Sequence, residues 1–124
     1  PNAAIVSRLK ALHPTIPIIG FPKGAGAKLA DYAAGTGVDA IGVDETVDPH
    51  WANRVLPKGL PVQGNLDPLA LIAGGEAVEQ AVDNIRAAFA DRPHIMNLGH
   101  GILPDTPIAH VEALLSYVRQ EEKR

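Results

Sequence analysis

The residue best suited to chemistry in this sequence is His100, which stands between Gly99 and Gly101. Glycines on both sides let the backbone approach a ligand closely and leave the imidazole little steric cover. A histidine in this setting can donate a hydrogen bond, exchange a proton near neutral pH or ligate a metal. The same pattern also fits a histidine that is hydrogen-bonded to a neighbouring loop, so both interpretations stay open on local sequence alone.

Three further polar residues, Lys23, Asp44 and Asn65, each follow a strand-like apolar run. In parallel α/β folds the carboxyl ends of the strands form the edge where ligands bind. Lys23 could meet an anionic ligand or lie exposed in solvent, and Asp44 could orient a ligand or a loop, or cap the backbone near Thr46. Turns need such residues in any case. We expect this rim to be the functional face, with His100 as the binding candidate and Asp44 and Asn65 as further candidates.

Metal chemistry has little support in the sequence. The chain contains no cysteine, which excludes thiol catalysis, disulfides and thiolate metal sites. His94 and His100 are separated by a strand-like run that spans roughly 20 Å when extended, so we do not expect them to share a metal. The residues themselves therefore predict no metal site.

Residues 24–29 (GAGAKL) come close to a dinucleotide-binding fingerprint, with Asp44 about 20 residues further on, where a ribose-binding acid would stand. However, Leu29 occupies the position of the third glycine, and Pro22 and Lys23 separate the strand from the first glycine. A free-standing α/β module that binds a nucleotide through this loop therefore remains the alternative function.

Composition places the chain among ordinary globular domains: 124 residues, 46% hydrophobic and 20% charged. A net charge of −3 argues against a nucleic-acid or anionic membrane partner. No apolar run approaches the ~18 residues of a transmembrane helix. The chain starts without Met and runs directly into a helical pattern, so we expect it to be part of a longer protein.

Short apolar runs alternate with helical patterns in a (β/α)4 series, which fits a small open α/β sheet or half of an eight-fold barrel. Strands are expected at residues 16–21, 40–43, 60–63 and 94–98, and helices at 5–12, 27–34, 49–56, 78–89 and from 107 onward. In two of these helices apolar residues recur at helical spacing and should be buried. They are Val78, Val82, Ile85 and Phe89 in the first, and Val111, Leu114, Leu115 and Val118 in the second.

Helix boundaries follow from capping signals. Asp48 and Pro49 predict an N-cap and first turn. The sequence DTP at 105–107 predicts another, and Gly35 and Gly37 predict the end of the helix at 27–34. Residues 121–124 are expected to form a solvated tail.

Two longer sequences carry a family resemblance: VQGNLDP at residues 62–68, and NLGHGI at 97–102 followed by PDTP at 104–107. In this order and about 30 residues apart, they resemble the C-terminal signature of uroporphyrinogen decarboxylases. FPKG at 21–24 and GVD at 42–44 also stand at strand ends where that family has similar segments. The resemblance covers nearly the whole chain.

The resemblance implies that residues 1–124 are the C-terminal (β/α)4 part of a single (β/α)8 TIM barrel, in a cytoplasmic homodimer. The implied reaction is decarboxylation of the four acetate side chains of uroporphyrinogen III to coproporphyrinogen III in haem biosynthesis, without metal or cofactor. His100 matches the family's substrate-contacting histidine. The family's catalytic Asp and Arg-rich segment lie upstream, so no catalytic residue is expected in this segment, which alone should be inactive.

A second alternative comes from relatives of similar fold. Corrinoid and coenzyme M methyltransferases hold zinc with His and Cys and have a Cys near the position of His100. Because this chain has no cysteine, the methyltransferase interpretation is the weaker one.

Overall fold

The computed structural model describes residues 1–122, with their side chains as far as residue 120. Four strands form one parallel sheet in the order β1-β2-β3-β4, so each strand pairs with its neighbours in sequence. The strands are β1 (Ile19–Gly20), β2 (Ala40–Gly42), β3 (Val62–Gln63) and β4 (His94–Ile95). The helices are α1 (Asn2–Leu12), α2 (Leu29–Thr36), α3 (Pro49–Val55), α4 (Pro68–Ala73), α5 (Glu76–Ala88) and α6 (Ile108–Glu122), with a 3-10 turn, η1 (Gly26–Lys28), before α2. The α/β class and the strand–helix alternation are confirmed.

The strands are shorter than the sequence predicted, most clearly at 16–21, where only Ile19–Gly20 is a strand. Pro17 has no backbone N–H. The N–H of Ile18 is used by the Asp39 carboxylate, 2.8 Å away, instead of a neighbouring strand. At the other edge, β4 ends at Ile95, and only Leu98 rejoins the sheet through an isolated bridge to Leu66. Each strand of the sheet is therefore only two or three residues long.

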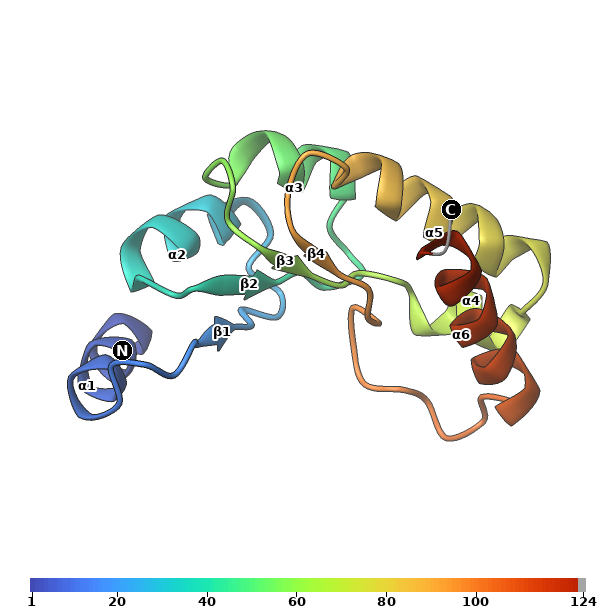
Figure 1. Ribbon diagram of the computed structural model, residues 1–124, viewed down its shortest axis with the longest axis horizontal. Helices are drawn as coiled ribbons and strands as arrows, with labels where there is room; N and C mark the ends of the chain where they lie inside the picture. Colours follow the sequence, from blue (N-terminus) through green and yellow to red (C-terminus); the bar gives the residue numbers. More distant parts are fainter. Residues whose placement is uncertain (123–124) are drawn as a thin grey trace.

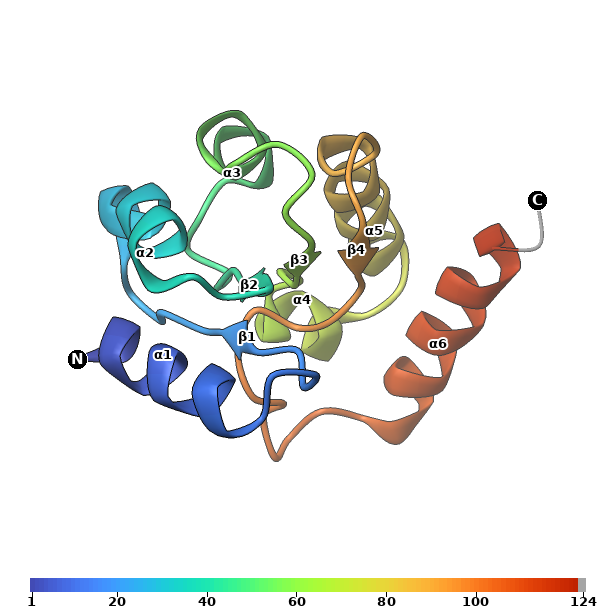
Figure 2. The ribbon, with the colours of Figure 1, turned by 60° about the vertical axis from the view of Figure 1, so that its left-hand side comes forward.

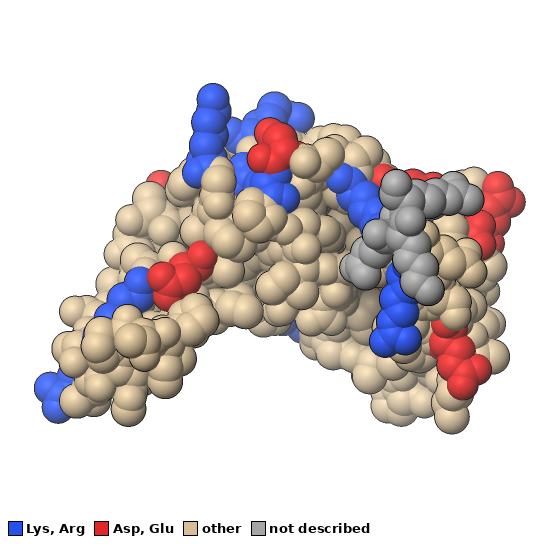
Figure 3. Space-filling view, viewed as in Figure 1, with Lys and Arg blue, Asp and Glu red and all other residues tan. Residues whose placement is uncertain are grey.

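Helices cover only one face of the sheet. Figure 1 shows α2, α3 and α5 arching over the strands, and the rotated view in Figure 2 shows the same arrangement. On the covered face Ile41 and Val62, which pair in register, are both 0% exposed. On the opposite face Ile19 and Ile95 are 46% and 47% exposed. In Figure 3 the hollow beneath the arch is mostly uncharged surface. The sheet thus has one solvent-facing apolar side.

The predicted apolar stripe on α5 is confirmed. Its four residues are buried, from 0% to 5% exposed, and pack into the core under the helix arch: Val78, Val82, Ile85 and Phe89. On α6 the prediction is only partly right. Val111, Leu114 and Val118 are half-buried, but Leu115 is 44% exposed, because α6 packs against α4 and α5 on one side only. The predicted tail at 121–124 falls outside the described side chains.

Capping explains where three helices begin or end. Asp48 accepts a hydrogen bond from the Trp51 N–H at 2.9 Å and starts α3, as predicted. Gly37 ends α2 in the left-handed conformation, although Gly35 lies inside that helix. Asp67 accepts from the Leu69 N–H at 2.8 Å and starts α4, a helix that the sequence prediction missed.

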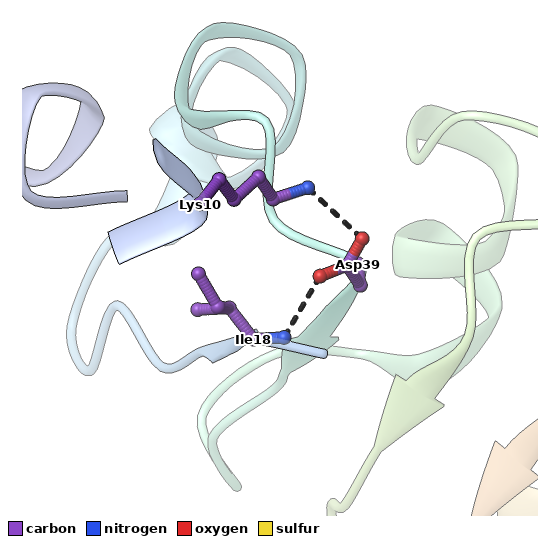
Figure 4. A network of polar contacts seen from close by, with 3 residues as sticks. All are labelled: Lys10, Ile18 and Asp39. Carbon is purple, nitrogen blue, oxygen red and sulfur yellow. Dashed lines mark hydrogen bonds and ion pairs between the residues drawn. The ribbon is translucent and has the colours of Figure 1, made fainter. Parts of the chain in front are cut away.

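One polar network ties α1 to the edge of the sheet (Figure 4). The Asp39 carboxylate accepts from the Ile18 N–H at 2.8 Å and from the Lys10 ammonium at 3.0 Å. The hydrogen bond from Ile18, followed by the contact with Lys10, lowers the pKa of Asp39 below its ordinary value. Within the described residues, no helix is both long and apolar enough to cross a membrane.

These exposed surfaces predict how the separate chain behaves. Edge strands β1 and β4 and the bare apolar face both favour association. We expect purified residues 1–124 to self-associate, as measured by light scattering during gel filtration. Replacing both Ile19 and Ile95 with Lys should reduce association. The control is Ile108→Lys, which places a lysine at a 77% exposed isoleucine on α6. A monodisperse monomer that melts cooperatively would contradict the prediction.

Candidate functional site

The carboxyl ends of all four strands surround one open cavity of about 380 Å³. Its polar lining consists of Gln63, Asn97 and His100, contributed by β3 and by the segment after β4. Apolar side chains complete the wall: Phe21, Val43, Leu98 and Ile102. The cavity therefore lies at the rim that the sequence predicted to be functional, and its lining combines apolar side chains with a few polar groups, as small-molecule sites tend to do.

His100 lies at this cavity together with a cation from the other end of the chain. The Lys23 Nζ is 3.0 Å from the His100 Nδ1 and 3.3 Å from its Nε2. Both side chains are exposed. The structure thus brings together two residues, 77 positions apart, that the sequence had marked separately.

Asp44 is 3% exposed and lies beneath the rim. One carboxylate oxygen accepts from the Gly24 N–H at 2.8 Å, and the other accepts from the Thr46 N–H at 2.9 Å and from the Thr46 hydroxyl. Burial raises the pKa of Asp44, but these hydrogen bonds and the charge of Lys23 outweigh it, so the pKa lies below its ordinary value. Asp44 both caps its own loop and orients the loop of Lys23.

Asn65 is 5% exposed, and its side chain holds the loop after β2. Its Nδ2 donates to the Asp44 carbonyl at 3.0 Å and to the Val47 carbonyl at 2.7 Å. Both amide hydrogens are thereby used. Its Oδ1 is buried without a hydrogen-bond partner among the described residues. This geometry gives Asn65 a positioning role; whether Asp44 or Asn65 also contacts a ligand stays a prediction.

Two glycines allow the rim loops to touch backbone to backbone. A Cβ on Gly99 would collide with the backbone N of Glu45, and a Cβ on Gly64 would lie 2.5 Å from the Val43 carbonyl oxygen. Any larger residue would force the loops after β2, β3 and β4 apart. The glycine before His100 is therefore needed for packing against residues 44–45.

His94 belongs to a different environment from His100. It is half-buried, its Nε2 lies 2.5 Å from the Gly64 carbonyl oxygen, and its ring centroid is 5.1 Å from that of Phe89. Burial lowers the pKa of His94 below its ordinary value, and the charge of Arg86 lowers it further. The hydrogen bond to Gly64 acts in the opposite direction but does not outweigh them. His94 is thus a structural link between β3 and β4. Among residues 1–122 no three metal-ligating side chains gather; the expected absence of a metal stays a prediction.

Sequence reasoning did not single out Gln63 and Asn97, which supply the remaining polar groups of the cavity. The Asn97 Oδ1 accepts from the Leu98 N–H at 2.8 Å. Each stands at the end of a strand-like run just before a glycine-containing turn, and that position was the available signal. Together with Lys23 and His100, they make a site that offers hydrogen-bond donors and positive charge beside apolar side chains, suited to an anionic ligand that also has an apolar part.

Comparison with known proteins identifies relatives along the whole chain. The family model described as uroporphyrinogen decarboxylase (URO-D) matches residues 1–121. A uroporphyrinogen decarboxylase of Sphingopyxis alaskensis is 71% identical over 119 residues, which cover 96% of this chain and 35% of that protein. That of Erythrobacter litoralis is 63% identical over 123 residues, 99% of this chain and 36% of that protein. The chain therefore spans about a third of the length of these relatives.

The buried carboxylate of Asp44 yields a stability prediction. We consider a hybrid in which residues 1–124 replace the matching segment of the S. alaskensis relative. Asp44→Asn should lower its free energy of unfolding by about 2–3 kcal/mol, because hydrogen bonds to a charged acceptor are lost. Urea unfolding measures this, and Asp31→Asn, at an exposed residue of α2, is the control for loss of charge alone.

The effect of Asp44→Asn should also depend on pH. The pKa of Asp44 is lowered from 3.8 in the folded protein. The ionised Asp44 carboxylate therefore contributes fully to stability above pH 3.8. This contribution is lost as the pH falls through the lowered pKa of the folded protein. The two proteins should converge in acid; an equal difference in stability at neutral pH and in strong acid would contradict the assigned role.

Proposed function

The chain belongs to the uroporphyrinogen decarboxylase family, and on that premise we propose that residues 1–124 are the C-terminal part of an enzyme that decarboxylates uroporphyrinogen. The observation that carries the proposal is the position of His100. The sequence around it has the family's NLGHGI pattern, and its ring lines the cavity at the shared strand-end rim, beside the Lys23 ammonium. A substrate that is an apolar macrocycle with carboxylate arms matches this cavity in both respects.

The proposed reaction replaces the carboxylate of each of four acetate arms with a proton. Protonation of a pyrrole lets the ring accept the electron pair of the carbon–carbon bond to the carboxylate as CO2 leaves. A proton then adds to the side-chain carbon, and the ring loses the proton that it had gained. His100 would donate a hydrogen bond to a substrate carboxylate and so orient it. The family's catalytic Asp and its Arg-rich segment lie upstream of the matched region, so residues 1–124 alone would be inactive. The product would be coproporphyrinogen III.

A closed eight-strand barrel is the architecture we propose for the whole protein. In a doubly wound open sheet the strand order reverses, and helices cover both faces. Here the order β1-β2-β3-β4 has no reversal, and α2, α3 and α5 all lie over the same face. Purely parallel sheets are normally buried on both faces. Four further strands would pair with the edges β1 and β4 and enclose the exposed side chains of Ile19 and Ile95.

The two alternative functions fit the site less well. A nucleotide phosphate would need free backbone N–H groups in the loop at 24–26, but the Gly24 N–H is bonded to Asp44. A zinc-dependent methyltransferase would need a cysteine, and the chain has none. A homodimer, cytoplasmic location and catalysis without metal or cofactor remain expectations for the longer protein.

The role of His100 can be tested by kinetics in the hybrid. His100→Ala should lower kcat/KM for uroporphyrinogen by about 10- to 100-fold, because a hydrogen bond to a charged group is lost. Coproporphyrinogen formation gives the rate, and a thermal melt checks the fold. His13→Ala, at an exposed histidine after α1, is the matched control. Unchanged kinetics would remove His100 from the site, and a hybrid without turnover would contradict the proposed function itself.

A further inference from the structure

Lys23 has unused hydrogen-bonding capacity next to His100. Its ammonium carries three N–H donors and no lone pair, and a neutral imidazole offers one acceptor nitrogen. The contacts of 3.0 and 3.3 Å to the His100 ring therefore use at most one of these donors fully. In the part of the chain that the structure describes, no carboxylate forms an ion pair with Lys23. At least two donors remain for a ligand.

The position of Lys23 is fixed by the surrounding backbone. The N–H of the next residue, Gly24, is bonded to the buried Asp44 carboxylate at 2.8 Å, and the Ala25 N–H closes a turn on the Pro22 carbonyl at 3.1 Å. The loop of His100 rests on the same segment, because Gly99 packs against the backbone of Glu45. Both loops are therefore set against residues 44–45, which places the two side chains together.

The charges around the pair favour an anion. Gln63 and Asn97, the other polar groups of the cavity lining, are neutral. The charge of Asp44 acts on Lys23, but each carboxylate oxygen of Asp44 already accepts hydrogen bonds from within the protein. A ligand carboxylate at the cavity mouth would have two oxygens to offer, and charge-assisted hydrogen bonds of this kind are strong and directional.

We propose that Lys23 is a second substrate-binding residue, and that Lys23 and His100 together bind one carboxylate of the substrate. This inference rests on the proposed function and extends it, because Lys23 supplies a positive charge from within residues 1–124. His100 alone provides a hydrogen bond; the pair provides a charge and a hydrogen bond to the same group.

The test compares Lys23→Met, His100→Ala and the double variant in the hybrid. Two quantities are measured: KM and kcat for uroporphyrinogen, and Kd for uroporphyrin, an unreactive fluorescent porphyrin with the same carboxylates. Lys23→Met should raise both KM and Kd about tenfold, with a smaller change in kcat and no change in the thermal melt. Lys23→Arg should restore most of the affinity. Lys28→Met, at an exposed lysine of η1, is the control for charge alone.

The double variant decides whether the carboxylate is shared. If both residues bind one group, the double variant should bind uroporphyrin only slightly more weakly than the worse single variant. Multiplicative losses would mean separate contacts and would overturn the shared site. Unchanged affinity in Lys23→Met, or an equal loss in Lys28→Met, would overturn the role of Lys23. A hybrid without turnover would contradict the proposed function, and the uroporphyrin affinities would still decide on Lys23.

Discussion

The candidate site depends on one buried carboxylate, that of Asp44. Burying a carboxylate is costly unless donors surround it, and here the donors come from Gly24 and Thr46, while Asn65 donates to the Asp44 main chain. Gly99 packs against the following residue, Glu45. Loops from all four strands thus meet at residues 44–45. The Asp44 carboxylate lies below the rim. Through these contacts it fixes the loops that carry Lys23 and His100 at the rim.

The second constraint is that the sheet has only one covered face. Helices α2, α3 and α5 cover the face that holds Ile41 and Val62. On the opposite face Ile19 and Ile95 are 46% and 47% exposed. Beyond these four strands, residues 1–122 contain no further strand that could close that side. The rim loops nevertheless reach a defined arrangement, because their contacts are made among themselves. The local order of the site therefore does not depend on closure of the sheet into the proposed barrel.

Sequence reasoning succeeded where the physical signal is local. The α5 stripe follows from helical spacing, the Asp48 cap from an Asp-Pro pair, and the rim from polar residues after strand-like runs. The same Asp-Pro signal is present at Asp67, but no helix was predicted from it, so α4 was missed. Strand ends were predicted less well, because Pro17 lacks an N–H and partners for the ladder depend on distant residues. Capping near Thr46 was one of the roles that the sequence left open for Asp44, and the structure confirms it. The hydrogen bond from the Gly24 N–H could not be predicted, since that donor is 20 residues away.

The most direct test of this account is a crystal structure of the hybrid with uroporphyrin bound. Our account predicts one porphyrin carboxylate within hydrogen-bond distance of both the His100 ring and the Lys23 ammonium. It also predicts an Asp44 carboxylate still bonded to the Gly24 N–H and eight strands closed into a barrel. A porphyrin bound away from the rim, or contacting it without His100, would contradict the central claim that these four loops form the substrate-facing part of a uroporphyrinogen decarboxylase.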